Sequence, residues 1–363
     1  MKILFITPKI NNQGGVARVL SLRSNYFIQN KNYQIHILTQ NSRNFPLFFD
    51  FDKRIVLHDM SLLGNPIKFL LSYRKGLNEL VAKINPDVIF VLDNGLKSYL
   101  LPYFLKTTIP LILEIHGSKY VQEKKVTNKL FDFFSIKIKE IGIKRYTKVI
   151  FLSNESALEW NYKKPIIISN PISFLTNDFS NLSSKKAIVV ARHSYEKGLD
   201  RMLNIWKRII EKYPDWNLEI YGKSNENQDL QEMVNSLGIG SNVTFFEPVK
   251  NILEKYLNSS LFLMTSRSEG FPMVLLEAMA LGLPVVAYDC PCGPRAIIKN
   301  GENGFLVEDS NADSFVEKLE LLMNDENLRI QMGLSARESV KKYNLENIMV
   351  QWKTLFEEMD SEI

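Results

Sequence analysis

The chain has 363 residues, 45% of them hydrophobic, and a formal net charge of +5. A chain of this length is expected to form two domains with sizeable cores. Its first ten residues, MKILFITPKI, hold an apolar run that is too short for a signal peptide. No apolar run approaches the roughly 18 residues that a membrane span needs, so the sequence predicts a cytoplasmic protein without a membrane-spanning segment.

The charge is distributed unevenly along the chain. Residues 1–170 hold 25 Lys and Arg against 12 Asp and Glu, a net +13, whereas residues 171–363 hold 20 against 28, a net −8. This asymmetry indicates two domains with different partners. Cys290 and Cys292 are too close in sequence for an unstrained disulfide, and the four histidines are too scattered to complete a zinc site. Both cysteines are therefore expected to be free.

The first half alternates strand and helix patterns. Apolar strands are predicted at 2–8, 34–40, 54–60, 87–93, 110–117, 148–153 and 164–170, with helices at 16–29, 65–84 and 95–105. Strands that are almost continuously apolar and alternate with helices are typical of a parallel, doubly wound sheet.

A loop rich in Asn and Gly, residues 11–15, joins the first strand to the first helix. A nucleotide-binding domain half usually begins with a strand, followed by a glycine-rich loop and a helix. The loop is not G-x-G-x-x-G, which disfavours a dinucleotide cofactor. Gly14 and Gly15 would let the backbone approach a diphosphate closely, although such a pair also occurs in ordinary loops.

Residues 119–148 are strongly basic, with nine Lys and Arg against three Asp and Glu, and they include Phe131, Phe133 and Phe134. Two interpretations stay open for this stretch. It can form amphipathic helices packed on the sheet, or a basic surface with aromatic side chains that binds an anionic membrane. Nucleic acid is disfavoured because no recognised binding module accompanies the charge.

A polar stretch rich in Ser and Asn, residues 178–186, is the best linker in the chain, and the first domain is expected to end near it. The second half repeats the alternation, with strands predicted at 186–192, 217–222, 243–249, 261–266, 284–288 and 304–307. The tail, residues 344–358, is predicted to be helical.

The most informative stretch is residues 266–289, SRSEGFPMVLLEAMALGLPVVAYD. Glu269 follows a strand at its carboxyl end, where open α/β sheets bind ligands. Glu277 lies about one and a half turns into the next helix. The backbone N–H groups at the start of that helix, residues 271–274, are expected to form an exposed anion site. A nucleotide-sugar would match this order, with its sugar at Glu269, its diphosphate at the helix start and its ribose at Glu277.

The filled motif, Glu269-Gly270-Phe271-Pro272 and Glu277-Ala-Met-Ala continued through GLPVVAYDCPCGPRAII, resembles the donor-site signature of the family 4 retaining glycosyltransferases. The bare Glu spacing is common by chance, but the filled motif is specific. The resemblance covers nearly the whole chain, most strongly residues 186–307 and least residues 40–110. It implies the α/β GT-B fold, two doubly wound Rossmann-like domains facing across a cleft. Residues 1–175 would form the acceptor-side domain, completed by a C-terminal helix at 344–363, and residues 176–343 the donor-binding domain.

The same resemblance assigns roles to other residues. Arg192 and Lys197 in ARHSYEKG resemble the family's phosphate-binding Arg and Lys-Gly. Two fixed cations would neutralise the leaving nucleoside diphosphate, which removes the need for a metal; the Asp-x-Asp at 50–52 is read as coincidental. His116 matches the family's His against the donor sugar, acting through a hydroxyl contact or through its main chain. Gly14 and Gly15 occupy the position of the family's N-terminal loop.

The donor side would be completed by the loop and helix start, namely Gly270, Phe271, Pro272, Met273 and Val274. The resemblance implies retention of anomeric configuration, with the departing phosphate aiding the acceptor hydroxyl on the same face. Glu269 would then orient the sugar, and Glu277 would accept hydrogen bonds from the ribose hydroxyls.

The predicted function is transfer of a sugar, without cofactor or metal, from a nucleotide-sugar, expected to be UDP-linked, to a glycan or lipid-linked acceptor. Surface polysaccharide biosynthesis on the inner face of the cytoplasmic membrane is the expected context. Two alternatives stay open. A nucleotide-sugar 2-epimerase on the same fold would need acid/base carboxylates and a His around the sugar, and a non-catalytic sensor would bind the donor without turnover.

Overall fold

A computed structural model describes residues 1–42, 45–62, 64–120, 129–172, 174, 176–224 and 229–361. Contacts divide the chain into two compact units. Unit 1 comprises Met1–Lys119 and Asn128–Ser169, and the main segment of unit 2 is Asn170–Ile363. Lys124 and Lys125, which belong to the predicted basic surface, lie outside the described residues.

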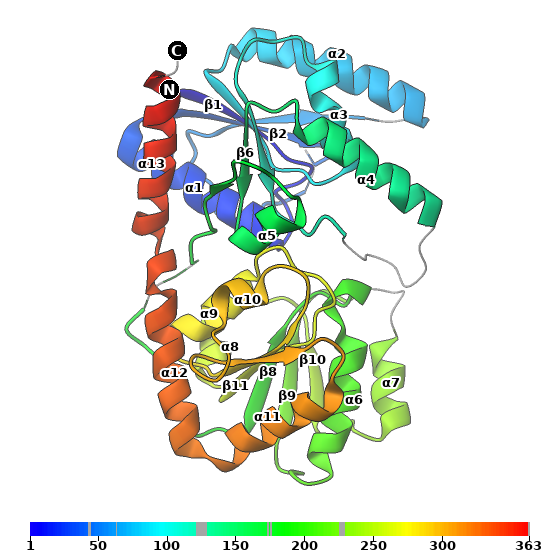
Figure 1. The fold of residues 1–363 in the computed structure, drawn as a ribbon, viewed down its shortest axis with the longest axis vertical. Helices are drawn as coiled ribbons and strands as arrows, with labels where there is room; N and C mark the ends of the chain where they lie inside the picture. Colours follow the sequence, from blue (N-terminus) through cyan, green and yellow to red (C-terminus); the bar gives the residue numbers. More distant parts are fainter. Residues whose placement is uncertain are drawn as a thin grey trace. The chain divides into compact units, whose positions relative to one another are not determined.

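Unit 1 contains a seven-stranded parallel sheet in the order β3-β2-β1-β4-β5-β6-β7 (Figure 1). Its strands are β1 (Lys2–Ile6), β2 (Gln34–Gln40), β3 (Val56–Met60), β4 (Val88–Val91), β5 (Leu111–Ile115), β6 (Lys148–Phe151) and β7 (Ile166–Ile167). All seven predicted strands are present, and the last is much shorter than predicted. β4 and β5 are buried at every position, which explains why they read as continuous apolar runs.

The helices of unit 1 are α1 (Gly15–Lys31), α2 (Pro66–Ile84), α3 (Leu96–Phe104), α4 (Lys129–Ile143) and α5 (Asn154–Glu159). The sequence signals that limit α2 are clear. The Asn65 side chain accepts a hydrogen bond from the backbone of Lys68, and Asn85 ends the helix in the left-handed conformation. α5 was not predicted, because six residues are too few for a periodic pattern.

Helix α4 lies within the basic stretch at residues 119–148, and its contacts bear on the two interpretations of that stretch. A Cβ on Gly142 would lie 2.2 Å from the backbone oxygen of Tyr99 in α3, so the two helices pack at a glycine. Another part of α4 is uncovered, because Phe133, Phe134 and Ile141 are 56%, 61% and 58% exposed. α4 therefore packs on α3 at Gly142, which agrees with the interpretation as an amphipathic helix, and Phe133, Phe134 and Ile141 are left exposed.

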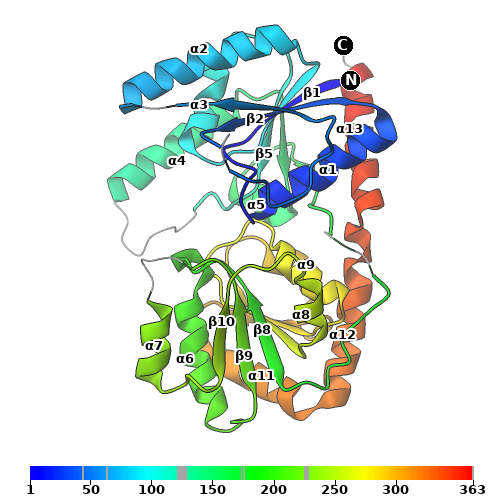
Figure 2. The same ribbon diagram turned by 180° about the vertical axis from the view of Figure 1, so that it is seen from behind.

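Unit 2 contains a six-stranded parallel sheet in the order β10-β9-β8-β11-β12-β13 (Figure 2). Its strands are β8 (Lys186–Val190), β9 (Asn217–Tyr221), β10 (Val243–Phe246), β11 (Leu261–Met264), β12 (Val285–Asp289) and β13 (Phe305–Glu308). The helices, including two 3₁₀ turns, are η1 (Tyr195–Lys197), α6 (Leu199–Ile210), α7 (Leu230–Leu237), α8 (Leu253–Leu257), α9 (Met273–Ala280), α10 (Pro294–Ile297), α11 (Ala312–Asn324), α12 (Glu326–Val340), η2 (Lys341–Tyr343) and α13 (Leu345–Ser361). Two doubly wound α/β sheets were predicted, and this fold class is confirmed.

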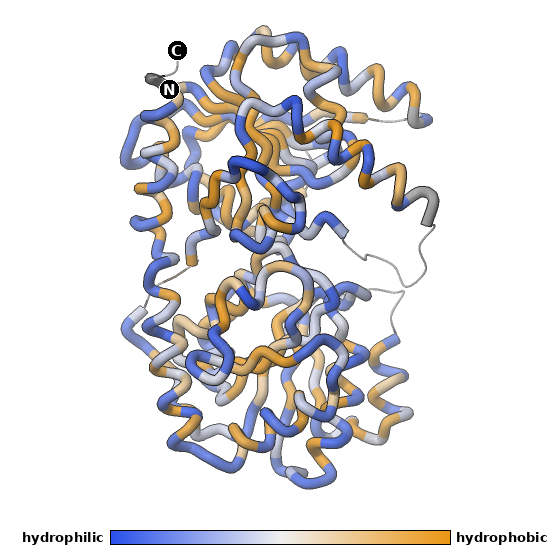
Figure 3. The backbone as a smooth tube through the Cα atoms, viewed as in Figure 1, coloured by the Kyte–Doolittle hydropathy of each residue, from blue (hydrophilic) through white to orange (hydrophobic). Residues whose placement is uncertain are grey.

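Each unit has its own apolar core around its sheet. Colouring by hydropathy shows that the strands are among the most hydrophobic segments of each unit (Figure 3). In unit 2 the largest wholly buried side chain is Trp206 of α6, whose Nε1–H donates to the backbone oxygen of Asn242 at 3.2 Å. That bond satisfies the polar atom that burial would otherwise leave unpaired.

Both sheets reverse their strand order at one point, between β1 and β4 in unit 1 and between β8 and β11 in unit 2. In open α/β sheets, ligands bind at the carboxyl ends of the strands at this switch point. Arg192 follows β8, Glu269 follows β11, and the Gly14-Gly15 loop follows β1. The fold therefore brings the predicted site residues of each unit to its ligand-binding edge.

Within the described ranges, no helix combines the length and the hydrophobicity that crossing a bilayer requires. The tail helix predicted at 344–358 is present as α13. Its return to the acceptor-side domain, expected from the resemblance, stays a prediction.

Candidate active site

Lys197 and Glu269 form the centre of the site in unit 2. Lys197 Nζ donates to both carboxylate oxygens of Glu269, at 2.8 Å each, although the two residues are 72 positions apart. Ser266 Oγ donates to Oε1 of the same carboxylate at 2.6 Å. The Lys197 side chain is 20% exposed and that of Glu269 is 8% exposed. Lys197, predicted to bind phosphate, and Glu269, predicted to bind the sugar, are thus in direct contact.

A glycine allows the two loops to approach this closely. Gly198 directly follows Lys197 and has φ +64°, and a Cβ there would lie 2.1 Å from the backbone oxygen of Thr265. Thr265 Oγ1 in turn donates to the backbone oxygen of Gly198 at 2.8 Å. Only glycine combines this conformation with this contact, which gives the Lys-Gly pair of the sequence a steric reason.

Arg267 is a part of the site that sequence reasoning missed. Its guanidinium donates to both carboxylate oxygens of Asp200, at 2.8 and 2.6 Å, and to the backbone oxygen of Tyr195 at 2.7 Å. Its own backbone N–H donates to the backbone oxygen of Glu196 at 2.7 Å. Burial alone would raise the pKa of Asp200, but the hydrogen bonds and charge of Arg267 outweigh it and lower that pKa. Arg267 therefore fastens the turn that carries Lys197 to the loop that carries Glu269.

Arg192 lies in the same turn region but does not contact Glu269. Its guanidinium donates to Glu196 at 2.9 Å, and its side chain is 67% exposed. An exposed arginine on a surface ion pair is free to change partner, because such pairs contribute little free energy. Its predicted role on phosphate stays a prediction.

The start of α9 is less open than the sequence predicted. Phe271, Pro272 and Met273 are buried, and Val274 is only partly exposed. Pro272 has no N–H to offer, and a Cβ on Gly293 would lie 2.7 Å from its Cδ. The row of N–H groups expected over residues 271–274 thus includes a proline without an N–H, and its role as an anion site stays a prediction. The part of the helix start that is left for an anion is Gly270 and Val274, both partly exposed.

Glu277 is fully buried, with 0% of the residue exposed. Tyr256 of α8 donates its hydroxyl hydrogen to Glu277 Oε2 at 3.2 Å. Nearly every position of α9 is buried, so helical spacing alone could not tell which way this side chain points. A ribose contact would need the carboxylate to become accessible, and the role stays a prediction.

In unit 1, the glycine loop opens α1. The backbone N–H of Gly14 donates to Asn12 Oδ1 at 2.9 Å, and a Cβ on Gly14 would lie 2.9 Å from the same oxygen. Gly14 is the N-cap of α1 and makes no side-chain capping bond, and Gly15 is exposed. The loop is therefore compact, and the helix start behind it is available to an anion.

His116 follows β5 at the same edge of the sheet. Its side chain is only 3% exposed, and its Nε2 lies 3.2 Å from Glu114 Oε2. Its backbone N–H donates to Asn94 Oδ1 at 3.4 Å. Asp93, which follows β4 at the same edge, pairs with Lys97 at 3.0 Å and accepts a hydrogen bond from the backbone of Gly95 at 2.8 Å. Both residues lie at the predicted edge, and the contact of His116 with the donor sugar stays a prediction.

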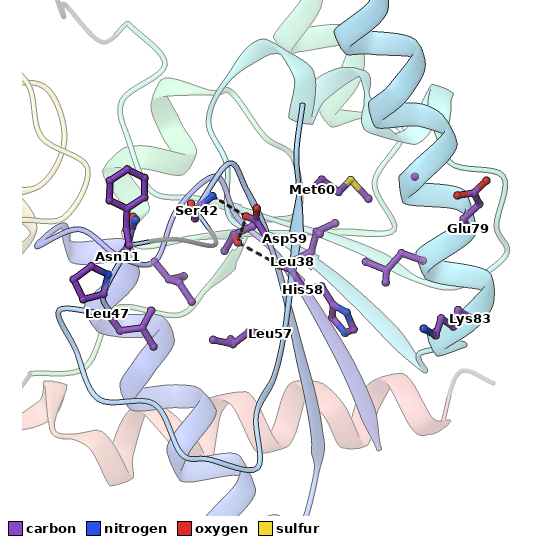
Figure 4. A pocket seen from close by; sticks show the side chains of 16 residues that line it. Asn11, Leu38, Ser42, Leu47, Leu57, His58, Asp59, Met60, Glu79 and Lys83 are labelled. Carbon is purple, nitrogen blue, oxygen red and sulfur yellow. Dashed lines mark hydrogen bonds between the residues drawn. The ribbon is translucent and has the colours of Figure 1, made fainter. Parts of the chain in front are cut away.

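Unit 1 also has a pocket of about 740 Å³ beside the edge strand β3 (Figure 4). Its lining comes mainly from β2, β3 and α2, with His58, Asp59, Glu79 and Lys83 as the charged or titratable members. None of the predicted site residues lines it. Cys290 and Cys292 are buried and are not joined in a disulfide.

Comparison with known proteins agrees with this geometry. Residues 176–339 match the family described as glycosyl transferases group 1, and residues 14–153 match glycosyl transferase 4-like proteins. The chain is 30% identical to an uncharacterized glycosyltransferase of Haemophilus influenzae, over 97% of this chain and 99% of that protein. It is 26% identical to the amylovoran biosynthesis glycosyltransferase AmsD of Erwinia amylovora, over 98% and 99%.

Among solved structures, a complex of Staphylococcus aureus TarM with fondaparinux, alpha-GlcNAc-glycerol and UDP superposes with a TM-score of 0.80 at 16% identity. That superposition covers 98% of this chain and 99% of TarM. The likeness extends over both units, and the sequence matches cover both halves of the chain. This protein therefore belongs to the family 4 glycosyltransferases and has the GT-B fold.

Proposed function

We propose that this glycosyltransferase transfers a sugar from a UDP-sugar to a glycan or lipid-linked acceptor, with retention of configuration and without a metal. The observation that carries the proposal is the contact of Lys197 with both oxygens of Glu269 at the switch point of unit 2. A cation and a carboxylate at that point are what a diphosphate leaving group and a sugar hydroxyl respectively require.

In this proposal each residue has one task. Lys197 and Arg192 neutralise the charge that develops on the departing nucleoside diphosphate. Glu269 holds the donor sugar through its hydroxyls, and the departing phosphate helps to deprotonate the acceptor. The acceptor would be bound by unit 1, where the pocket beside β3 offers both apolar and charged lining. The likeness to TarM, whose structure contains UDP, and to AmsD, a polysaccharide biosynthesis enzyme, supports the choice of donor and context.

Donor binding and turnover test the proposal. At a donor concentration of about one hundred times Kd, we expect UDP-sugars to raise the Tm by about 3–5 °C and other nucleotide-sugars to raise it less. Free UDP should then be released only when an acceptor lipid or glycan extract is added, and EDTA should not reduce the rate.

The alternatives give different results in the same assay. A nucleotide-sugar 2-epimerase would convert the sugar without any acceptor, and a non-catalytic sensor would bind the donor and release no UDP with any extract. Inhibition by EDTA that added divalent metal reverses would contradict the metal-free mechanism.

We further propose that unit 1 binds the anionic inner face of the cytoplasmic membrane through α4. Phe133 and Phe134 are exposed beside each other, with ring centroids 5.8 Å apart, and Lys144 and Arg145 at the end of the same segment are also exposed. The excess of positive charge in residues 1–170 favours anionic lipid. The aromatic rings would add attachment that salt does not screen.

The variant F133S/F134S should reduce partition onto anionic liposomes about tenfold at high salt, where the apolar contribution dominates. Partition is measured by cosedimentation. The matched control is L334S, since Leu334 is 58% exposed on α12 of the acidic half, and it should bind as wild type does. Equal partition of F133S/F134S and wild type would show that the exposed rings have no membrane role.

A further inference from the structure

Arg23 and Glu114 form a buried ion pair that the proposed reaction does not use. Arg23 lies on α1 and Glu114 on β5, and each side chain is 1% exposed. Two parallel hydrogen bonds join them, from Nη1 to Oε2 at 3.0 Å and from Nη2 to Oε1 at 2.8 Å. Such fork-to-fork geometry is the strongest and most directional form of this interaction. A buried pair of this kind adds little to stability compared with apolar side chains. Stability therefore does not explain why the pair is present.

The pair crosses the switch point of unit 1. The Arg23 guanidinium lies over the ring of Phe5 in β1, at 4.9 Å, and 5.8 Å from the ring of Phe90 in β4. It then reaches Glu114 in β5, the next strand along the sheet. One side chain therefore ties α1, which begins at the Gly14-Gly15 loop, to the strand that ends at His116.

Glu114, held in place by Arg23, also contacts the ring of His116. The carboxylate oxygen Oε2, already bonded to Arg23, lies 3.2 Å from His116 Nε2. Burial alone would raise the pKa of Glu114, but the charge of Arg23 and the hydrogen bonds from His116 and Arg23 outweigh it and lower that pKa. Glu114 is thus an ionised carboxylate, which can only accept hydrogen bonds. The hydrogen at this contact must lie on Nε2, and whenever the ring carries a single hydrogen, Nδ1 has the lone pair.

We propose that Arg23 and Glu114 are positioning residues, which hold the His116 ring by Nε2 and leave Nδ1 as its only acceptor. This inference rests on the proposed sugar transfer and on the prediction from the sequence that His116 lies against the donor sugar. The His116 side chain is 3% exposed, so the donor must first reach the ring; Nδ1 can then accept a hydrogen bond from a sugar hydroxyl without a change of tautomer. The fixed ring also holds the backbone of residues 116 and 117, which is partly exposed at the ligand-binding edge, in one place relative to the start of α1.

Two double variants separate positioning from stability. R23M/E114L replaces both charges with apolar side chains and removes the acceptor for His116. R23M/E114Q removes the same charges but keeps a side-chain oxygen that can accept from Nε2–H. The single variant E114L would leave the Arg23 charge buried and unpaired, and we expect its Tm to fall by about 10 °C. The double variants should stay within a few degrees of each other.

The decisive measurement is the tautomer of His116, read from the ¹⁵N shifts of ¹⁵N-histidine-labelled protein. The chain has only four histidines, and the H116Q variant identifies the signals of His116. We expect the Nε2–H tautomer in wild type and in R23M/E114Q, and a mixture of tautomers in R23M/E114L. With a UDP-sugar as substrate, kcat should fall about tenfold to a hundredfold in R23M/E114L. In R23M/E114Q it should stay within about threefold of wild type.

An Nδ1–H or mixed tautomer in wild type would overturn the inference, whatever the activity. Equal losses of kcat in the two double variants, with the tautomer unchanged in both, would do the same, since the pair would then only support the fold. Failure of the proposed function gives a distinct result, because wild type would show no sugar transfer at all while the tautomer remained measurable.

Discussion

Replacing Glu269 with Gln is expected to reduce sugar transfer about 10³-fold or more while UDP binds more tightly. The loss of rate follows if Glu269 orients the donor sugar in the transition state, where a single misplaced or missing contact is costly. The gain in UDP affinity follows from the contact with Lys197, which donates to both Glu269 oxygens at 2.8 Å. A diphosphate must share or displace that carboxylate at Lys197, and E269Q frees the Lys197 charge for the diphosphate. We expect UDP to bind about tenfold more tightly, or ~1.4 kcal/mol.

Isothermal titration with UDP and steady-state rates with a UDP-sugar measure the two effects separately. Ser266 provides a matched control, since its hydroxyl donates to the same carboxylate at 2.6 Å but would not touch the sugar. S266A should lower kcat far less than E269Q and leave the affinity for UDP close to that of wild type. Turnover by E269Q at the rate of wild type would remove Glu269 from the site.

The strands, and the bounds of the helices predicted at 16–29, 65–84, 95–105 and 344–358, were predictable because their signals are local. A strand buried on both faces is an apolar run, and a helix is bounded by residues such as Asn65 and Asn85 within a few positions of its ends. The same is true of the Glu269 loop, whose place after β11 follows from the strand that precedes it. These predictions needed no knowledge of distant contacts.

The partners of the site residues were not predictable in this way. Arg23 and Glu114 are 91 positions apart, and Arg267 and Asp200 are 67 apart. Which residues meet over such distances depends on how the strands are ordered, and the order is fixed by packing of the whole unit. One signal was present in the sequence. Glu114 interrupts an otherwise apolar strand, and a charge at a position buried on both faces requires a buried partner of opposite charge.

The direction of Glu277 escaped prediction for a related reason. A helix with one apolar face reveals which side chains point outward. α9 is buried on nearly all sides, so its sequence carries no such contrast. The structure directs Glu277 to Tyr256 on α8, a contact that no spacing rule within α9 could supply.

Lys197→Ala is expected to lower kcat by about 10²–10³, or ~2.7–4 kcal/mol in the barrier, and Arg192→Ala to lower it less. The sequence predicted that both cations stabilise the leaving phosphates to a similar extent, but their surroundings in the structure differ. Lys197 is 20% exposed and held by Glu269, whereas Arg192 is 67% exposed and pairs with the carboxylate of Glu196, whose side chain is 13% exposed. A partly buried cation acts on developing charge through less solvent, and its attraction is screened less.

The affinity for UDP should weaken in K197A, which is the opposite of its change in E269Q, because one variant removes the cation and the other removes its competitor. The double variant K197A/E269Q should then bind UDP no more tightly than K197A, since the effect of Glu269 on the diphosphate acts through Lys197. Titration of UDP into the two single variants and the double variant closes this cycle. Additive changes in the free energy of UDP binding would mean that the Lys197–Glu269 contact has no part in donor binding. A larger loss of kcat in R192A than in K197A would mean that Arg192, not Lys197, contributes more to stabilising the leaving phosphates.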